Sequence, residues 1–323
     1  MLNYIRSSDT PTLHLSPLLI LASLPQIPQR LLLRGPCNLD PLILCPGLHQ
    51  QCGTLHNGEY PTTAAMTTGY VFRIENAATV AWLQSISSTG HLTTVRVAQT
   101  STAKVRMDVA GIGEQVLYLT GALLTLIATA SNFLTEDYWA LLALLTLIAS
   151  RSLNTLVLQR RLTTHWHGAL EPGVQGDLLV LLSQDRWIRL RGAVDALKAL
   201  TSGSWMREPT AFESFLLDIA QLLVYVSVGI VAPNATPAGN LGLIGLLLVT
   251  TAALAGANVW AKRKLRGNGC RAVVEKVSGR YGRRRDLAEE MVREVGRGDW
   301  AVRLGMLRRE DREGKAEAEG VTM

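Results

Sequence analysis

Long uncharged apolar stretches dominate the hydropathy pattern of this chain. Residues 115–135 carry no charge, and a second apolar stretch from Tyr138 to Leu158 follows a short acidic bend at Glu136 and Asp137. At 1.5 Å per residue, about 20 helical residues cross a hydrocarbon layer roughly 30 Å thick. Each stretch is therefore long enough to be a transmembrane helix, and the short bend makes the two helices antiparallel neighbours.

A second pair of spans is expected further along the chain. Residues 219–261 are uncharged, which is enough for two crossings if the chain turns near Pro233 and Pro237. The pattern predicts a polytopic membrane protein that is mainly α, with a four-helix transmembrane bundle made of two hairpins. The hairpins cover residues 114–161 and 212–261, and their spans lie at about 115–135, 138–158, 212–232 and 239–260.

Residues 1–65 differ from everything that follows. They hold eight of the twelve prolines and three of the four cysteines, and they contain few charges. The apolar run from Leu18 to Leu24 is too short to span, and prolines on both sides forbid a longer helix. The segment also lacks the features of a secretory signal. We expect a largely disordered Pro-rich leader, and we hypothesise that the natural start is near Met66 or that the leader is dispensable.

Three polar segments separate and follow the spans: 66–113, 162–211 and 262–323. Period-two alternation and turn residues predict short strands and helices in them. The expected strands are 91–99, 104–109, 178–182, 187–190 and 299–306, the expected helices are 192–200 and 286–295, and residues 271–277 fit either state. No segment is long enough to bury a core alone. We expect them to join in a small α+β cytosolic cap built from three separate segments, with disorder after about 308.

The distribution of bases predicts the orientation. The two bends contain no Lys or Arg, whereas basic residues flank the opposite ends of the spans, which places both termini and the cap in the cytosol. The net charge of +6 resides in the tail. Its basic cluster favours contact with anionic lipid at the cytosolic face over nucleic acid. This cluster consists of Lys262, Arg263, Lys264 and Arg266.

Arg151 is the most informative single residue, because a guanidinium near mid-membrane costs about 2.5 to 3.5 kcal/mol on insertion scales unless it has a partner. Counted from the cytosolic ends, Asp218 lies at nearly the same depth, and Gln221 shares a helix face with it. We hypothesise an intramembrane polar pair of Arg151 and Asp218 assisted by Gln221. The alternatives are that Arg151 snorkels to the interface, that the span ends early, or that these residues handle a transported ion.

Small residues of the last span would let another helix approach closely. They are Gly239, Gly242, Gly245 and Gly256. We expect packing within the monomer, with a homo-oligomer as the alternative. The group His165-Trp166-His167 and the cysteines and histidines of the leader fit no metal-ligand spacing, so we expect neither a metal nor a cofactor.

The chain contains no Walker loop, no nucleophile elbow, no zinc-protease motif and no dinucleotide fingerprint. We therefore do not expect an enzyme. The expected function is a membrane anchor or scaffold that presents a cytosolic cap to a protein or lipid partner. The alternative is a small transporter or channel subunit whose polar site is formed by Arg151, Asp218 and Gln221.

Overall fold

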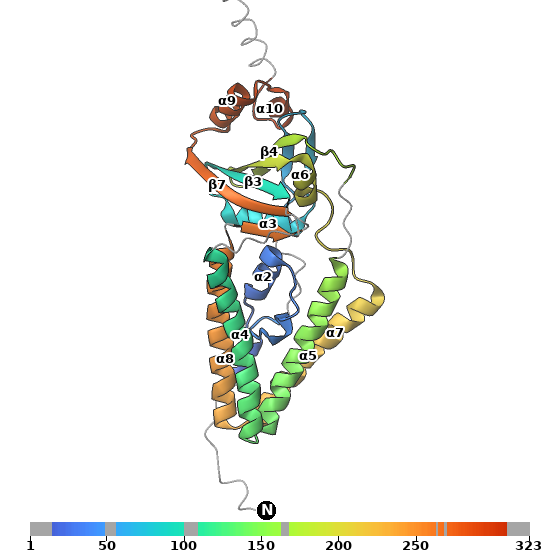
Figure 1. Cartoon of the computed structure of the whole chain (residues 1–323), viewed down its shortest axis with the longest axis vertical. Coiled ribbons are helices and arrows are strands. Elements are labelled where there is room, and N and C mark those ends of the chain that lie inside the picture. Colours follow the sequence, from blue (N-terminus) through green and yellow to red (C-terminus); the bar gives the residue numbers. More distant parts are fainter. Residues whose placement is uncertain are drawn as a thin grey trace, which may run out of the picture.

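The computed structural model describes residues 15–48, 56–99, 109–162, 168–262, 264–267 and 270–308. Four long helices lie at one end of the molecule and a sheet at the other (Figure 1). The long helices are α4 (Val109–Leu134), α5 (Tyr138–Arg161), α7 (Ala211–Asn234) and α8 (Pro237–Ala261). By length and composition, all four could cross a membrane, which agrees with the four predicted spans.

The long helices form a V rather than the four-helix bundle of two hairpins that we expected. Helix α4 packs mainly against α8, and α5 mainly against α7, whereas α4 and α5 share a much smaller contact. The two arms converge at the bends and open toward the sheet (Figure 1). Asp137 joins the bends: its side chain caps α5 by accepting from the amide of Ala140 at 3.1 Å, and it accepts from the hydroxyl of Thr236 at 2.5 Å. A Cβ at Gly239 would overlap this carboxylate.

Residues 15–48 fill the opening of the V and are called the N-terminal wedge. They form α1 (Leu15–Ile20), α2 (Gln26–Arg34) and the 3-10 helix η1 (Asp40–Leu42). Helix α1 contacts α7 and α8, α2 contacts α8, and η1 contacts α4 and α5. Leu31 and Leu44 are 1% and 0% exposed. The expectation of a disordered leader is therefore wrong for these residues. The two arms of the V offer apolar surface, and the apolar residues of the wedge cover it. Residues 1–14 and 49–55 lie outside the described part.

In the described part of the chain, seven strands form one sheet with the order β2-β1-β4-β5-β3-β7-β6. The strands are β1 (Thr62–Ala65), β2 (Val71–Arg73), β3 (His91–Gln99), β4 (Gln175–Leu182), β5 (Arg186–Ala193), β6 (Lys264–Gly267) and β7 (Cys270–Arg280). Neighbours are antiparallel except β3 and β5, which are parallel. All three polar segments thus contribute to one sheet, as the sequence predicts. The fold is mixed, not mainly α, since only 55% of it is helical.

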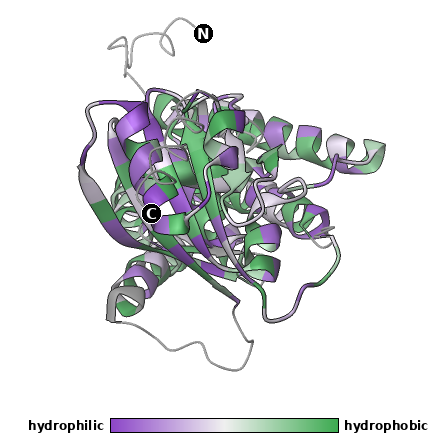
Figure 2. Cartoon of the chain, turned by 90° about the horizontal axis from the view of Figure 1, so that it is seen from above, coloured by the Kyte–Doolittle hydropathy of each residue, from purple (hydrophilic) through white to green (hydrophobic). Residues whose placement is uncertain are grey.

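Both faces of the sheet are covered. Leu178 and Val180 of β4 belong to the hydrophobic cluster that continues into the N-terminal wedge, whereas Leu179 between them belongs to a separate cluster. Helices α3 (Ala77–Ile86) and α6 (Val194–Thr201) pack in the first cluster, and α9 (Arg284–Val295) and α10 (Asp299–Arg303) in the second. Viewed from above, hydrophobic and hydrophilic positions interchange along the strands (Figure 2).

Several local predictions can be compared with the observed elements. The strand at 91–99, the strand pair at 178–190 and the helices at 192–200 and 286–295 are confirmed as β3, β4, β5, α6 and α9. The strand expected at 299–306 is wrong, because residues from Asp299 form α10, whose Trp300 is fully buried. Residues 104–108 of another expected strand lie outside the described part, and Val109 begins α4.

Candidate functional site

The structure does not bring Arg151 and Asp218 together. Arg151 is 4% exposed, whereas Asp218 lies on the exposed surface of α7. Within the described residues, no hydrogen bond or ion pair joins the two side chains, and Gln221 donates instead to the hydroxyl of Tyr225 at 3.3 Å. The three predicted residues therefore do not form one site.

The reason lies in how α5 and α7 are rotated about their axes. The hydroxyl of Ser150 donates to the carbonyl of Ala220 at 2.6 Å, and the hydroxyl of Ser227 to that of Ala143 at 3.1 Å, so these residues mark the α5–α7 contact. At about 100° per residue, Asp218 is turned roughly 200° from Ala220. It therefore points away from α5, although its depth matches that of Arg151.

Arg151 lies near enough to the buried Cys45 of the N-terminal wedge for the two side chains to interact electrostatically. The Nε of Arg151 is buried and has no hydrogen-bond partner in the described part of the chain. Because a buried polar group without a partner is costly, this position does not add to stability through pairing.

An ionic and aromatic cluster instead forms between the wedge and α4. Arg34 of α2 makes a two-fold hydrogen-bonded ion pair with Glu114 of α4, with its Nε at 2.5 Å from one carboxylate oxygen. The hydroxyl of Tyr118 donates to Asp40 at 2.5 Å, and the guanidinium of Arg30 lies 4.4 Å from the centre of the Tyr118 ring. Asp40 and Glu114 are 1% and 8% exposed, so the polar groups of α4 bind the wedge.

Polar residues of α8 bind the wedge in the same way. The hydroxyl of Thr250 donates to the carbonyl of Leu44, and the amide of Asn258 donates to the carbonyl of Gln26 at 2.9 Å. Near the bends, the hydroxyl of Ser16 donates to Asn240 at 2.8 Å. These polar groups of α8 thus hold the wedge in place.

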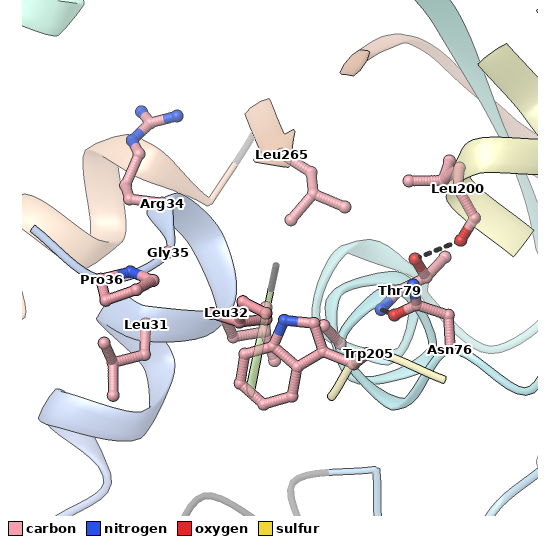
Figure 3. Close-up of a pocket in the computed structure, with 12 residues that line it drawn as sticks. Leu31, Leu32, Arg34, Gly35, Pro36, Asn76, Thr79, Leu200, Trp205 and Leu265 are labelled. Atoms are coloured by element: carbon pink, nitrogen blue, oxygen red, sulfur yellow. Dashed lines mark hydrogen bonds between the residues drawn. The ribbon is translucent and has the colours of Figure 1, made fainter. Parts of the chain in front are cut away.

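The cap is attached to the chain after α8 and to α2 of the wedge by two hydrogen bonds. The indole Nε1 of Trp82 in α3 donates to the carbonyl of Lys262, directly after α8, at 2.8 Å, and Arg34 donates to the carbonyl of Lys264 at 3.3 Å. A cavity of about 240 Å³ remains at this junction. Figure 3 shows Leu32 and Trp205 close together on one side, Leu265 above them, and Thr79 bonded to Leu200 at 2.6 Å.

A second ionic network lies on the cap. Arg189 of β5, whose side chain is 5% exposed, donates to Asp177 of β4 at 2.6 Å and to Glu294 of α9 at 2.5 Å. Arg191 bonds the same two acids. Burial alone lowers the pKa of Arg189, but its hydrogen bonds to the two carboxylates outweigh this and raise it. Hydrogen bonds from Arg189 lower the pKa of Glu294. The network joins α9 to the sheet.

The remaining predicted residues are dispersed. A Cβ at Gly256 would approach Leu117 of α4 at 3.2 Å, whereas Gly242 and Gly245 face open space. Lys262 is exposed, Lys264 is partly buried in β6, and Arg263, His165, Trp166 and His167 lie outside the described residues. Among the residues that are described, no group of three or more His, Cys, Asp or Glu side chains could hold a metal ion.

Reasoning from the sequence missed Arg30, Arg34, Asp40, Glu114 and Tyr118. The available signal was Arg30 and Arg34, two bases four residues apart beside apolar residues in a segment poor in charge. Comparisons with protein-family models, curated proteins and solved structures found no match.

Proposed function

We propose that this chain is an integral membrane protein that anchors a cytosolic cap and presents it to a protein partner or to lipid. The observation that carries this proposal is the use of the buried polar groups of α4 and α8. Glu114, Tyr118, Thr250 and Asn258 each bind the N-terminal wedge. A wedge fixed in this way makes the long helices a support for the cap.

The distribution of bases supports the cytosolic orientation of the cap. All strands lie at the open end of the V, and the helix ends there carry Arg160, Arg161 and Lys262. The bends at the other end contain no Lys or Arg. By the positive-inside rule, the sheet end faces the cytosol, and the described C-terminal elements α9 and α10 lie on that side. Ser16, near the start of the described part, bonds Asn240 beside the bends at the opposite end, which does not support the expected cytosolic N-terminus.

The competing proposal, a transporter or channel subunit, has less support. Its site requires Arg151, Asp218 and Gln221 to act together, and Asp218 is exposed on the far side of α7. The unpartnered Nε of Arg151 is the observation that still favours it.

Two measurements test the proposed function. Alkaline extraction should leave the chain in the membrane pellet, and a C-terminal tag should be accessible to protease from the cytosol. A photo-crosslinker replacing exposed Arg293 on α9 should then give discrete protein or lipid adducts, with exposed Leu126 on α4 as the bilayer-facing control. A protected cap or soluble extraction would contradict the proposal. Ion flux in reconstituted liposomes that Arg151→Leu abolishes would favour the transporter.

A further inference from the structure

A cavity of about 480 Å³ lies where α8 ends, between α2 and α3. Its walls include Gln26, Gln29, Leu33, Ser85, Asn258 and Lys262. The inference drawn from it rests on the proposed function, because the cavity adjoins lipid only if α8 crosses the membrane. In that arrangement it lies beside the last two turns of α8, next to the cytosolic headgroups.

The cavity is apolar on one side and polar on the other. Leu32 and Leu33 of α2 are 8% and 5% exposed and form its buried apolar wall. Val259, which also lines it, is 68% exposed on the outer surface of α8, so the cavity opens sideways toward the surface that would contact acyl chains. Gln29 and Ser85 are exposed at its polar side. This two-sided lining fits an amphipathic molecule that enters from the bilayer.

The charge of the lining favours an anion. Lys262 is exposed at the cavity, and its ammonium has no ion pair within the described residues. None of the described lining residues is acidic. The backbone of Lys262 is fixed, since its carbonyl accepts from Trp82 at 2.8 Å and its amide donates to Asn258 at 3.0 Å. A phosphate at this position would gain a charge-assisted hydrogen bond.

Asn258 adds a fixed polar group to the wall of the cavity. Its Nδ2 donates to the carbonyl of Gln26, and a carbonyl can only accept, so the orientation of the amide is settled. The charge that a ligand can meet among the described lining residues is therefore that of Lys262. We propose that the cavity binds the headgroup of an anionic glycerophospholipid such as phosphatidylglycerol.

The test uses the full chain purified in detergent and titrated with phosphatidylglycerol or phosphatidylcholine, with bound lipids counted by native mass spectrometry. We expect a preference for phosphatidylglycerol. Lys262→Gln should weaken its binding about fivefold, since one well-placed charge contributes about 1 kcal/mol near a membrane surface. Ala81→Phe, which fills the cavity without a charge change, should also reduce binding. Lys276→Gln on β7 is the matched control, because it removes one exposed positive charge away from the cavity.

Equal binding of the two lipids, or equal losses from Lys262→Gln and Lys276→Gln, would overturn the proposal. Displacement of the lipid by soluble glycerol phosphate would also overturn it and would assign the site to a free phosphate ester. Thermal midpoints of all variants show whether each one folds. Alkaline extraction separates the two claims: a chain that stays in the membrane but shows no lipid preference refutes this site alone, whereas a soluble chain refutes the membrane anchor.

Discussion

The ion pair between Arg34 and Glu114 offers the sharpest test of the N-terminal wedge. Both side chains are largely buried, at 13% and 11% exposed, and they join the wedge to α4. Replacing Glu114 by Gln leaves the guanidinium of Arg34 in the same place without a counter-charge. Removing one partner of a buried pair costs about 3 to 5 kcal/mol, whereas replacing both by apolar residues of similar size is often neutral.

Cys45 can report on this change, because its side chain is 0% exposed in the wedge. With Cys37, Cys52 and Cys270 replaced by Ser, a thiol reagent can label only Cys45. Labelling then requires the wedge to open. If opening is a rapid equilibrium, a loss of about 3 to 5 kcal/mol raises the labelling rate by about 100-fold to 4,000-fold, at a factor of ten per 1.4 kcal/mol.

The double variant Arg34→Met with Glu114→Leu is the matched control, and its labelling rate should return close to that of the parent. The exposed Arg285 and the partly buried Glu289 also form an ion pair on α9, so Glu289→Gln provides a comparison far from the wedge that should not affect Cys45. A parent chain whose Cys45 reacts as fast as in denatured protein would show that the wedge is not packed in the V. An unchanged rate in Glu114→Gln would show that this pair does not hold it.

Three further predictions concern the cap and the long helices. Trp82→Phe removes the hydrogen bond to the carbonyl of Lys262 and leaves a void at a fully buried position. It should therefore cost more than the roughly 1 kcal/mol of the hydrogen bond, measured as faster amide exchange in α3 and β6 but not in α9. Glu294 has a lowered pKa, so its contribution to stability is present above its unfolded pKa of about 4.3 and is lost as the pH falls through its folded pKa. Glu294→Gln should therefore make the free energy of unfolding less dependent on pH below about pH 4.3, by less than about 1 kcal/mol because the carboxylate is half exposed. A variant that loses stability in acid as steeply as the parent chain would contradict this. Arg151→Leu should raise the thermal midpoint in detergent, because it removes a buried Nε that has no hydrogen-bond partner among the described residues, and Asp218→Asn should leave the midpoint unchanged. Equal losses of stability in the two variants would instead support the predicted pair.

The long helices were predictable because a run of apolar residues sets a span without reference to the rest of the chain. Several strands of the cap were predictable for a similar reason, since the apolar run at residues 178–182 of β4 and the turn that follows it are local features of the sequence. The failures involve partners that are distant in sequence. The depth of a residue can be counted from the ends of its helix. To predict whether Arg151 meets Asp218, one must also know how α7 is rotated about its axis, and the contact between Ser150 and Ala220 sets that rotation.

The N-terminal wedge failed for a different reason. Its prolines exclude one long helix, but they permit the short helices α1 and α2, with Pro17 inside α1 and Pro28 near the start of α2. Leu31 and Leu44 cover apolar surface that exists only once the two arms of the V have separated, so their burial cannot be read from residues 1–65 alone.

The position of the wedge favours a membrane anchor over a transporter or channel subunit. A water-filled path between the arms would require the wedge to leave, since it occupies the opening of the V. Its departure would break the Arg34–Glu114 pair and the Tyr118–Asp40 hydrogen bond, and each would leave a charged or polar group in apolar surroundings. It would also disturb the cap, because α2 contacts α3 and β6 as well as α8. A transporter that opens the V would therefore loosen the cap in every transport cycle, whereas an anchor keeps all of these contacts in place. The wedge is better explained as the element that makes the long helices and the cap one unit.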